Sequence, residues 1–257
     1  MAEPKKKKII DATTGEEIAA GSKKKPVMVE AAPVGNATGL RVGAIVLWVL
    51  AIVFEVLALL VAIGKVDLKF NPIAQLILFM ILDLACVIIG AQLWKKANHI
   101  KPASEKNPTL FWLWNNMGVL VACIAFIPFI ILILTNKNVD GKTKKLATIV
   151  AIACLLIGGV SSYDFNPVSA EQQQAAVEAI SDDVYWSRFG KVYHTHDDCQ
   201  ALNRSEELRY GTVEQAIADG RTRLCSFCAK RDAISGVATD NVDVSDYIPD
   251  EAVEEAA

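Results

Sequence analysis

GKVYHTHDDCQALN (residues 190–203) and LCSFC (residues 224–228) decide how the C-terminal part of this chain folds. Cys225 and Cys228 form a C-x-x-C pair, a spacing that lets two thiolates face one metal ion. A second half-site lies upstream, where Cys199 follows either His194 or His196. Two half-sites separated by about two dozen residues predict one tetrahedral site, and Zn²⁺ suits it because this ion accepts both thiolate and imidazole ligands.

The choice of ligands leaves one alternative open. We expect the metal to be held by His194, Cys199, Cys225 and Cys228, with His196 as the alternative to His194. Tyr193 and His194 end a β-prone run, and this favours His194. A competing interpretation is a redox dithiol with unrelated histidines, but the sequence lacks the βαβ context of thioredoxin-type motifs. Four protein ligands leave no open coordination position for hydrolysis, so we expect no catalytic residues and no enzymatic activity.

The surrounding residues predict a small α+β domain. Val184–Trp186 and Lys191–His194 are β-prone runs joined through Gly190, which suggests a hairpin. Thr212 and Gln215 form a capping box for a helix that ends near Asp219, where Gly220 supplies the stop. A domain of about fifty residues buries too little apolar surface to be stable alone, so a metal crosslink is expected to stabilise it.

The same residues resemble the zinc-binding module of the Ada DNA-repair family. The shared elements are Gly190, Tyr193, His194, Cys199, Ala216, Gly220, Cys225 and Cys228, within residues 184–231. In Ada-type modules four cysteines hold zinc, and the first also accepts a methyl group from a DNA phosphotriester. This chain has His194 at the position of that first cysteine. The resemblance therefore implies the fold and the metal, and not the repair activity.

The rest of the chain reads as a membrane protein. The composition is 53% hydrophobic and the mean hydropathy is +0.32, too apolar for an ordinary soluble fold. Apolar runs cover residues 42–63, 73–93, 110–134 and 146–159. The first three meet the requirement of about 20 residues for a membrane span, and the fourth is short. The expected fold is an α-helical membrane protein with four transmembrane helices, plus a small α+β zinc-binding domain on the C-terminal side.

Lysines indicate the orientation of these spans in the cell membrane. Lys5–Lys8, Lys23–Lys25 and Arg41 favour a cytoplasmic N-terminus, and Lys95, Lys96, Lys101 and Lys106 favour a cytoplasmic second loop. Four spans then place the zinc module in the cytoplasm, where a reducing environment agrees with unpaired cysteines. The alternative is an extracytoplasmic module, because Lys137, Lys142, Lys144 and Lys145 would otherwise face outward.

Domain boundaries follow from composition. We expect a disordered, Lys-rich N-terminal segment (residues 1–40), a four-helix transmembrane domain (41–162), a helical linker (163–183), the zinc-binding domain (184–231) and an acidic disordered tail (232–257). In the linker, Ser169 and Gln172 form a capping box for a helix through about Ile180. The tail contains eight acidic residues and no Lys or Arg.

Two carboxylates in the spans suggest a second class of function. Glu55 and Asp83 lie well inside the first and second apolar runs, near the predicted bilayer midplane. Ionisable groups at this depth are costly and by default indicate ion or proton passage. The other interpretation is that both stay protonated and join helices through hydrogen bonds.

The sequence thus supports three hypotheses about function. The first is a membrane protein whose structural zinc module docks a protein partner or senses metal or redox state; the second is a transporter or channel-like protein that uses Glu55 and Asp83. The third is a membrane-tethered DNA-binding module. Residues 181–231 carry eight Asp or Glu and eight Lys or Arg, so the electrostatic basis for binding nucleic acid is weak. Arg221, Arg223, Lys230 and Arg231 are the residues available for a local basic patch. The sequence names neither the protein partner nor the solute, and it does not indicate an oligomeric state.

Overall fold

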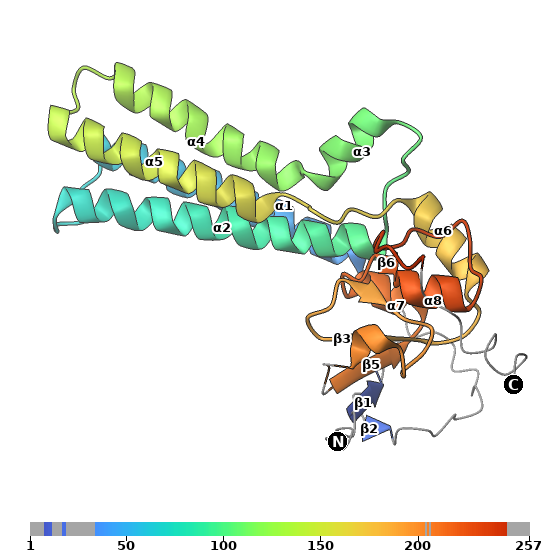
Figure 1. The fold of residues 1–257 in the computed structure, drawn as a ribbon. Helices are drawn as coiled ribbons and strands as arrows, with labels where there is room; N and C mark the ends of the chain where they lie inside the picture. Colours follow the sequence, from blue (N-terminus) through green and yellow to red (C-terminus); the bar gives the residue numbers. More distant parts are fainter. Residues whose placement is uncertain (1–7, 12–16, 19–33, 204, 206, 246–257) are drawn as a thin grey trace, which may run out of the picture. The chain divides into compact units, whose positions relative to one another are not determined.

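The computed structural model describes residues 8–11, 17–18, 34–203, 205 and 207–245 (Figure 1). The chain divides into two compact units. One unit, here the helical unit, contains Ala37–Asn98 and Asn107–Phe165. The other, here the mixed unit, contains Met1–Asn36, His99–Lys106 and Asn166–Ala257. Each unit is described by itself.

Long apolar helices build the helical unit. The helices are α1 (Ala37–Ala62), α2 (Pro72–Ile100), α3 (Pro108–Asn115), α4 (Met117–Thr135) and α5 (Gly141–Ser162). Among the described residues, α1, α2, α4 and α5 are long and apolar enough to cross a membrane, with mean hydropathies of 2.9, 2.5, 3.0 and 1.9. The prediction of four such helices is confirmed. The last of them is longer than expected, because Asp140 caps it through the amides of Lys142 and Thr143.

The third apolar run was expected to form one helix, but it forms two, α3 and α4. The helix breaks at Asn116, whose φ of −110° and ψ of 25° are not helical. The side-chain amides of Asn115 and Asn116 donate to the carbonyls of Phe111 and Trp112 at 3.0 and 2.9 Å. Asn116 Oδ1 also accepts the Asp164 amide at 3.2 Å. Polar side chains that bond to nearby backbone compete with helical hydrogen bonding, and this explains the break.

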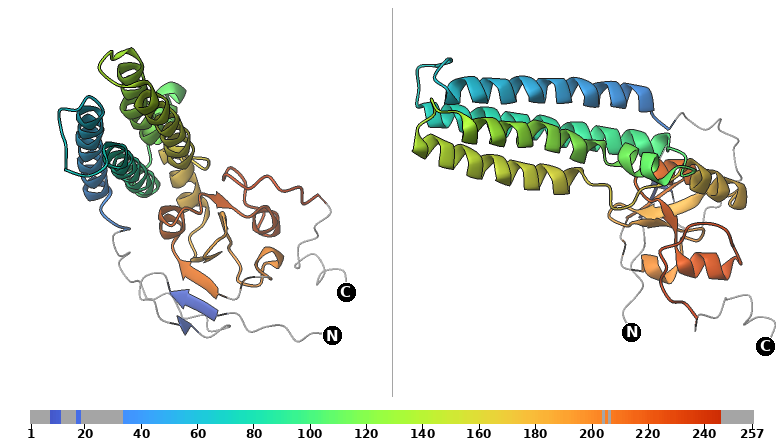
Figure 2. Two further views of the ribbon diagram at one scale, coloured as in Figure 1. Left: turned by 90° about the vertical axis from the view of Figure 1, so that its left-hand side faces the viewer. Right: turned by 90° about the horizontal axis from the view of Figure 1, so that it is seen from above.

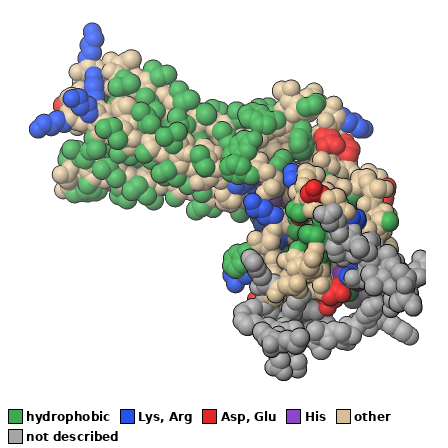
Figure 3. All heavy atoms as spheres, in the orientation of Figure 1, with side chains coloured by type: hydrophobic (Ala, Val, Ile, Leu, Met, Phe, Trp, Pro, Cys, Tyr) green, Lys and Arg blue, Asp and Glu red, His purple; other side chains and the backbone are tan. Residues whose placement is uncertain are grey.

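Small residues pack the helical unit and large apolar residues cover it. Ala44, Ala51 and Ala58 of α1 recur every seventh residue and are fully buried. Alanine stripes let helix backbones approach closely, as in membrane bundles. The outward positions carry valine, isoleucine and leucine, for example Ile149 and Val160, and Figure 3 shows hydrophobic side chains over most of the visible surface of these helices. A unit that is apolar both inside and outside matches a lipid environment.

The mixed unit contains two small sheets and several short helices (Figure 2). The larger sheet has the order β2-β1-β5-β3, formed by β2 (Glu17–Ile18), β1 (Lys8–Asp11), β5 (Glu207–Gly211) and β3 (Val184–Ser187). The smaller sheet pairs β4 (Val192–Tyr193) with β6 (Arg223–Leu224) in parallel. The helices are α6 (Ala170–Ala179), the 3-10 helix η1 (Gln200–Leu202), α7 (Val213–Ala218) and α8 (Ser226–Arg231). Trp186, Tyr193, Leu208, Ile217 and Leu224 form the centre of one buried core.

Both predicted capping boxes are present. The Ser169 hydroxyl accepts the Gln172 amide and starts α6, and the Thr212 hydroxyl accepts the Gln215 amide and starts α7. Gly220 follows α7 with a φ of +85°, the left-handed conformation that glycine adopts without steric cost. Local hydrogen bonding is readable from sequence because both partners lie a few residues apart.

The expected hairpin forms only in part. Tyr185 and His194 exchange both backbone hydrogen bonds, at 2.7 and 2.8 Å, in one antiparallel bridge. Beyond that bridge, β3 pairs with β5 and β4 pairs with β6. The two strands therefore belong to different sheets, because each finds its longer pairing with a strand distant in sequence.

The structure differs from the predicted domain boundaries at both ends of the mixed unit. Lys8–Asp11, expected to be disordered, pairs in parallel with β5. Residues 232–245, expected to belong to a disordered tail, complete the fold: the Leu224 amide donates to the Ala238 carbonyl at 2.9 Å, and Asp240 Oδ1 accepts the Ser226 amide at 3.0 Å. In each case the added segment satisfies backbone groups at a strand edge or at the start of a helix. Residues 1–7, 12–16, 19–33 and 246–257 of the predicted disordered segments lie outside the described residues.

Candidate metal centre

Short elements of the mixed unit place four ligand side chains together. His194 directly follows β4, and Cys199 precedes η1. Cys225 is the N-cap of α8 and Cys228 lies in its first turn. The register of the small sheet pairs Tyr193 with Leu224, and the Cys225 amide donates to the Tyr193 carbonyl at 2.9 Å. The pairing of β4 with β6 thus brings the two half-sites, about two dozen residues apart in sequence, to one point.

The geometry suits a tetrahedral ion. The ligand atoms of His194, Cys199, Cys225 and Cys228 all lie within 4.8 Å of one another, and all four residues are buried. Cys199 Sγ and Cys225 Sγ are 3.9 Å apart, and Cys228 Sγ and His194 Nδ1 are 3.8 Å apart. Metal–sulfur bonds of about 2.3 Å in a tetrahedron require sulfur atoms about 3.8 Å apart. The cluster can therefore hold one metal ion with little rearrangement.

The three thiols share negative charge. Hydrogen bonds from Cys199 and Cys225 hold the pKa of the Cys228 thiol far below its usual range, and His194 acts in the same direction. Hydrogen bonds to Cys225 and Cys228, together with burial, raise the pKa of Cys199. A cation that binds here displaces protons from the thiols, so its affinity depends on pH.

His196 lies outside the cluster. Its Nε2 atom is 2.6 Å from Asp232 Oδ1, and its side chain is 35% exposed, whereas His194 is 3% exposed as a residue. The Thr195 hydroxyl donates to the other oxygen of Asp232. The Asp232 amide in turn donates to the Cys228 carbonyl at 3.0 Å. Asp232 thus fastens the loop that carries His194 to the end of the helix that carries Cys228.

The sequence did not reveal the role of Asp232. This residue is the C-cap of α8 and lies one position beyond the predicted end of the domain at residue 231. An aspartate directly after two basic residues in a short helix carries no local signal of a contact with a loop thirty-six residues upstream. Only the fold brings these residues together.

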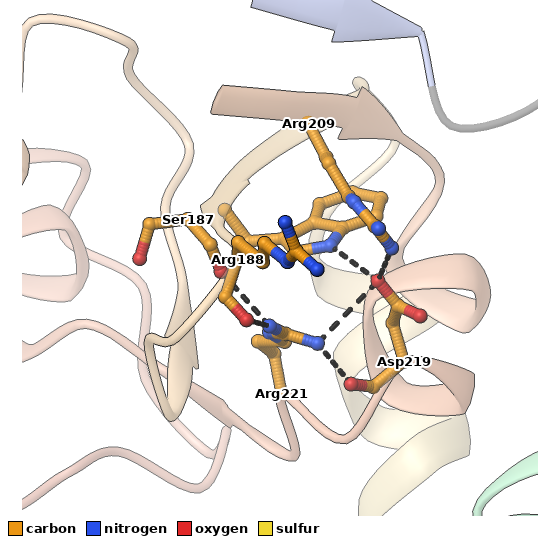
Figure 4. Close-up of polar contacts among 6 residues, drawn as sticks. Ser187, Arg188, Arg209, Asp219 and Arg221 are labelled. Atoms are coloured by element: carbon orange, nitrogen blue, oxygen red, sulfur yellow. Dashed lines mark hydrogen bonds and ion pairs between the residues drawn. The ribbon is translucent and has the colours of Figure 1, made fainter. Parts of the chain in front are cut away.

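A buried arginine holds the turn after β3 against the end of α7 (Figure 4). Arg221 Nη2 donates to the carbonyls of Ser187, at 2.9 Å, and of Arg188. Its Nη1 atom donates to the Asp219 carbonyl and lies 3.4 Å from Asp219 Oδ2. Asp219 Oδ2 also accepts Trp186 Nε1–H at 3.0 Å and the guanidinium of Arg209. This polar network joins the core tryptophan, both strands of the β3–β5 pair and α7.

Three of the four basic residues considered for a nucleic-acid patch make contacts within the mixed unit. Arg221 donates to the backbone carbonyls of Ser187, Arg188 and Asp219. Lys230 Nζ donates to the carbonyls of Val244 and Ser245 at 2.6 and 2.8 Å. Arg231 Nη1 donates to Asp198 Oδ1 at 2.9 Å. Cations engaged in this way offer little to a phosphate backbone.

In the helical unit, Glu55 and Asp83 lie on α1 and α2. Asp83 is 1% exposed, and its Oδ1 atom has no hydrogen-bond partner among the described residues. Glu55 is close enough to interact with it electrostatically.

No family model, curated protein or solved structure matches the chain. The resemblance to Ada-type modules therefore stays an expectation carried by the quoted residues. Functional proposals for this chain must rest on its own helices and on its own cluster of ligands.

Proposed function

We propose that this chain is an integral membrane protein whose mixed unit is a structural zinc domain that docks a protein partner at the membrane face. The observation that carries this proposal is the buried cluster of one imidazole and three thiols with tetrahedral spacing. Zn²⁺ fits this donor set best, because it accepts nitrogen and sulfur together and has no geometric preference of its own. Four protein ligands fill the coordination sphere, so the ion acts by stabilising the fold.

The absence of an open coordination position favours a binding role over catalysis. In an Ada-type repair module the first ligand is a methyl-accepting thiolate, and His194 stands at that position here. A zinc-bound imidazole is a far poorer methyl acceptor than a zinc-bound thiolate. Three of the four basic residues near the site, Arg221, Lys230 and Arg231, make contacts within the unit, so binding to DNA is the least supported hypothesis. What is left is a rigid surface for a protein partner.

The chain segments that make up the mixed unit support one orientation in the membrane. Its segments before α1, between α2 and α3, and after α5 belong to one compact unit. A single unit of this kind lies on one side of a bilayer. The chain must therefore cross the bilayer an even number of times between one segment of the mixed unit and the next. The helix pairs α1–α2 and α4–α5 each provide two crossings. The lysines of the first and second segments favour the cytoplasm as that side.

The zinc proposal is tested on the full chain purified in detergent. We expect one Zn²⁺ per chain by elemental analysis, and loss of the metal in Cys225→Ser and in Cys228→Ser. Cys123→Ser, which changes a thiol in α4, is the matched control and should keep the metal. Chelation should expose the mixed unit to protease and leave α1, α2, α4 and α5 intact, because a small domain loses its fold with its metal. A protease-resistant mixed unit after complete removal of zinc would contradict the proposal.

A transport function is the second candidate, and the observation in its favour is the buried, unpaired Oδ1 atom of Asp83. Buried carboxylates near the midplane are typical of proton or cation pathways. Glu55→Gln and Asp83→Asn keep the shape of each side chain and remove its titratable proton. Loss of proton or cation flux in vesicles reconstituted with these variants, with normal zinc content, would favour transport. Unchanged stability and unchanged cellular role in the double variant would favour carboxylates that only join the helices.

A further inference from the structure

Helix α3 is a separate apolar helix whose role in the fold is not explained by packing. Its eight residues, Pro108–Asn115, include five large apolar side chains, Leu110 to Trp114. Leu110 is 60% exposed, Trp112 47%, Leu113 37% and Trp114 38%. Only Asn115 is buried. Large apolar side chains that are exposed around one short helix mark a surface that contacts something else.

The adjoining helix does not need α3 to cross the bilayer. Helix α4 has 19 residues and so is about 28 Å long, close to the hydrocarbon thickness of about 30 Å. Asn116 ends the helical continuity between the two, and Figure 1 shows α3 turning away from the axis of α4. Helix α3 is therefore free to take a direction of its own.

The C-terminal end of α3 is held at the level where α2 leaves its apolar stretch. Trp94 Nε1 and Asn98 Nδ2 both donate to the Trp114 carbonyl, at 2.8 and 3.2 Å. Trp94 is followed by Lys95 and Lys96. It lies eleven residues, or about 16 Å, beyond Asp83, which corresponds to the edge of the hydrocarbon layer when Asp83 is near the midplane. These contacts set the depth of α3.

An arginine and two indoles mark the same level. The Arg41 guanidinium lies 5.8 Å from the centre of the Trp94 ring and 5.3 Å from that of Trp114, and it donates to Asn98 Oδ1 at 3.3 Å. Indole rings and cationic side chains together are typical of the boundary between headgroups and acyl chains. At that depth, a helix that pointed outward would place four large apolar side chains in water.

We propose that α3 is an interfacial helix that lies in the headgroup region of the bilayer, with Leu110, Trp112, Leu113 and Trp114 in contact with the acyl-chain boundary. The occupant of the exposed patch is lipid, because the patch is continuous with the apolar surface of the membrane helices of the same unit and lies beside their basic and aromatic boundary residues. This inference rests on the insertion of the helical unit that the proposed function requires. It does not depend on the metal.

The segment before α3 gives the lipid contact a consequence. Residues 99–106 belong to the mixed unit, where the Ala103 carbonyl accepts the Ala170 amide at 3.0 Å. Glu171 of α6 accepts the Ser104 hydroxyl and, at 3.0 Å, the Glu105 amide. Asn107 then caps α3 by accepting the Leu110 amide. An interfacial α3 thus ties the segment that binds α6 to the bilayer surface.

Tryptophan fluorescence of the full chain in phosphatidylcholine and phosphatidylglycerol vesicles tests the proposal. The difference between the wild-type protein and Trp112→Phe isolates the emission of Trp112. Lipids brominated near the glycerol end of the acyl chain should quench this difference signal at least about twofold, and more than lipids brominated near the methyl end, because interfacial helices lie shallow. Iodide in the water should leave it nearly unchanged. Trp48→Phe, which removes a buried indole of α1, is the control for changes that any tryptophan substitution causes.

Two results would overturn the proposal. Quenching by iodide without quenching by brominated lipid would place Trp112 in water. Protection from both quenchers would show that protein, either a second copy or a partner, covers α3. Failure of the proposed function is distinguishable from either: a chain that is not inserted does not float with the vesicles, and a chain without zinc still reports the position of Trp112.

Discussion

His194 and His196 are two positions apart in sequence and differ in every contact that matters for metal binding. His194 is buried beside Cys228, whereas His196 is half-exposed and paired with Asp232. We expect His194→Ala to lose the metal, since three thiols alone leave a vacant position. His196→Ala should keep one Zn²⁺ per chain and lower only the thermal stability of the mixed unit. Elemental analysis of both purified variants checks this pair, and the reverse pattern would show that the ligand is His196.

Arg221 stabilises the mixed unit by donating to three backbone carbonyls, those of Ser187, Arg188 and Asp219. Its side chain is only 9% exposed. Arg221→Ala removes this buried donor from all three carbonyls, and we expect a loss of about 2–4 kcal/mol in the free energy of unfolding of this unit. Chemical denaturation followed by fluorescence of the core tryptophan measures it. Arg223→Ala removes the same charge from β6 and should cost much less; equal losses would mean that charge, and not the buried contacts, is responsible.

Spacing predicted which four side chains cluster, because metal chemistry constrains residue types and distances more tightly than it constrains the fold. The C-x-x-C pair and the upstream His and Cys could therefore be recognised before any contact was known. The contacts of Asp232 and Arg221 could not be recognised, because each depends on backbone carbonyls and loops that only the tertiary fold brings near. Polar residues that bind backbone leave no partner residue to find in the sequence.

At the scale of elements, α6 and residues 99–106 are joined through one carboxylate. A hydrogen bond from Ser104, and then the amide of Glu105, lower the pKa of Glu171 below its usual range. A lowered pKa means that the contact favours the carboxylate, so its stabilisation is complete above the ordinary glutamate pKa. It is lost as the pH falls through the lowered value. Glu171→Gln should weaken this contact at neutral pH in the way that protonation of Glu171 weakens it at low pH.

Hydrogen exchange measures this contact directly. We expect the backbone amide of Glu105 to exchange faster in Glu171→Gln than in the wild-type protein at neutral pH. The reason is that a glutamine side chain is a weaker hydrogen-bond acceptor than a carboxylate. Glu178→Gln in the same helix is the control and should leave Glu105 unchanged. Equal protection of Glu105 in all three proteins would show that Glu171 does not hold this segment.

Helix starts were predictable and helix interruptions were not. The capping boxes at Ser169 and Thr212 use residues three apart, which a sequence shows directly. The break at Asn116 depends on two asparagines that bond to carbonyls one turn back, and on the Asp164 amide from the chain after α5. A continuous hydropathy signal passes over such a break, because flanking leucines and tryptophans dominate the average. The parallel pairing of Lys8–Asp11 with β5 was equally invisible, since its partner lies about two hundred residues away.

At the scale of the whole molecule, the order of segments along the chain constrains the topology. Three segments of one compact unit alternate with two pairs of helices that are long and apolar enough to cross a membrane. The proposed function requires both loops within the pairs, after α1 and after α4, to face the opposite side of the bilayer. The lysines of the loop after α4 then face away from the cytoplasm, in conflict with the usual bias. The order of the segments thus predicts that the loop after α4 faces away from the cytoplasm, whereas its lysines predict that it faces the cytoplasm.

Labelling of single cysteines decides between these two orientations of the loop after α4. Lys65→Cys lies in the loop after α1, Lys137→Cys in the loop after α4 and Lys106→Cys in the segment before α3, and all three positions are exposed. We expect a membrane-impermeant thiol reagent to label the first two in intact cells and the third only after permeabilisation, because a single membrane crossing separates each loop from the mixed unit. The native Cys199, Cys225 and Cys228 should react only after permeabilisation and chelation, since a bound metal blocks their thiolates. Labelling of Lys106→Cys alone in intact cells would reverse the orientation and place the mixed unit outside. Protection of Lys137→Cys together with labelling of Lys65→Cys would instead show that α4 and α5 do not both cross, and that the loop lysines prevail over the order of the segments.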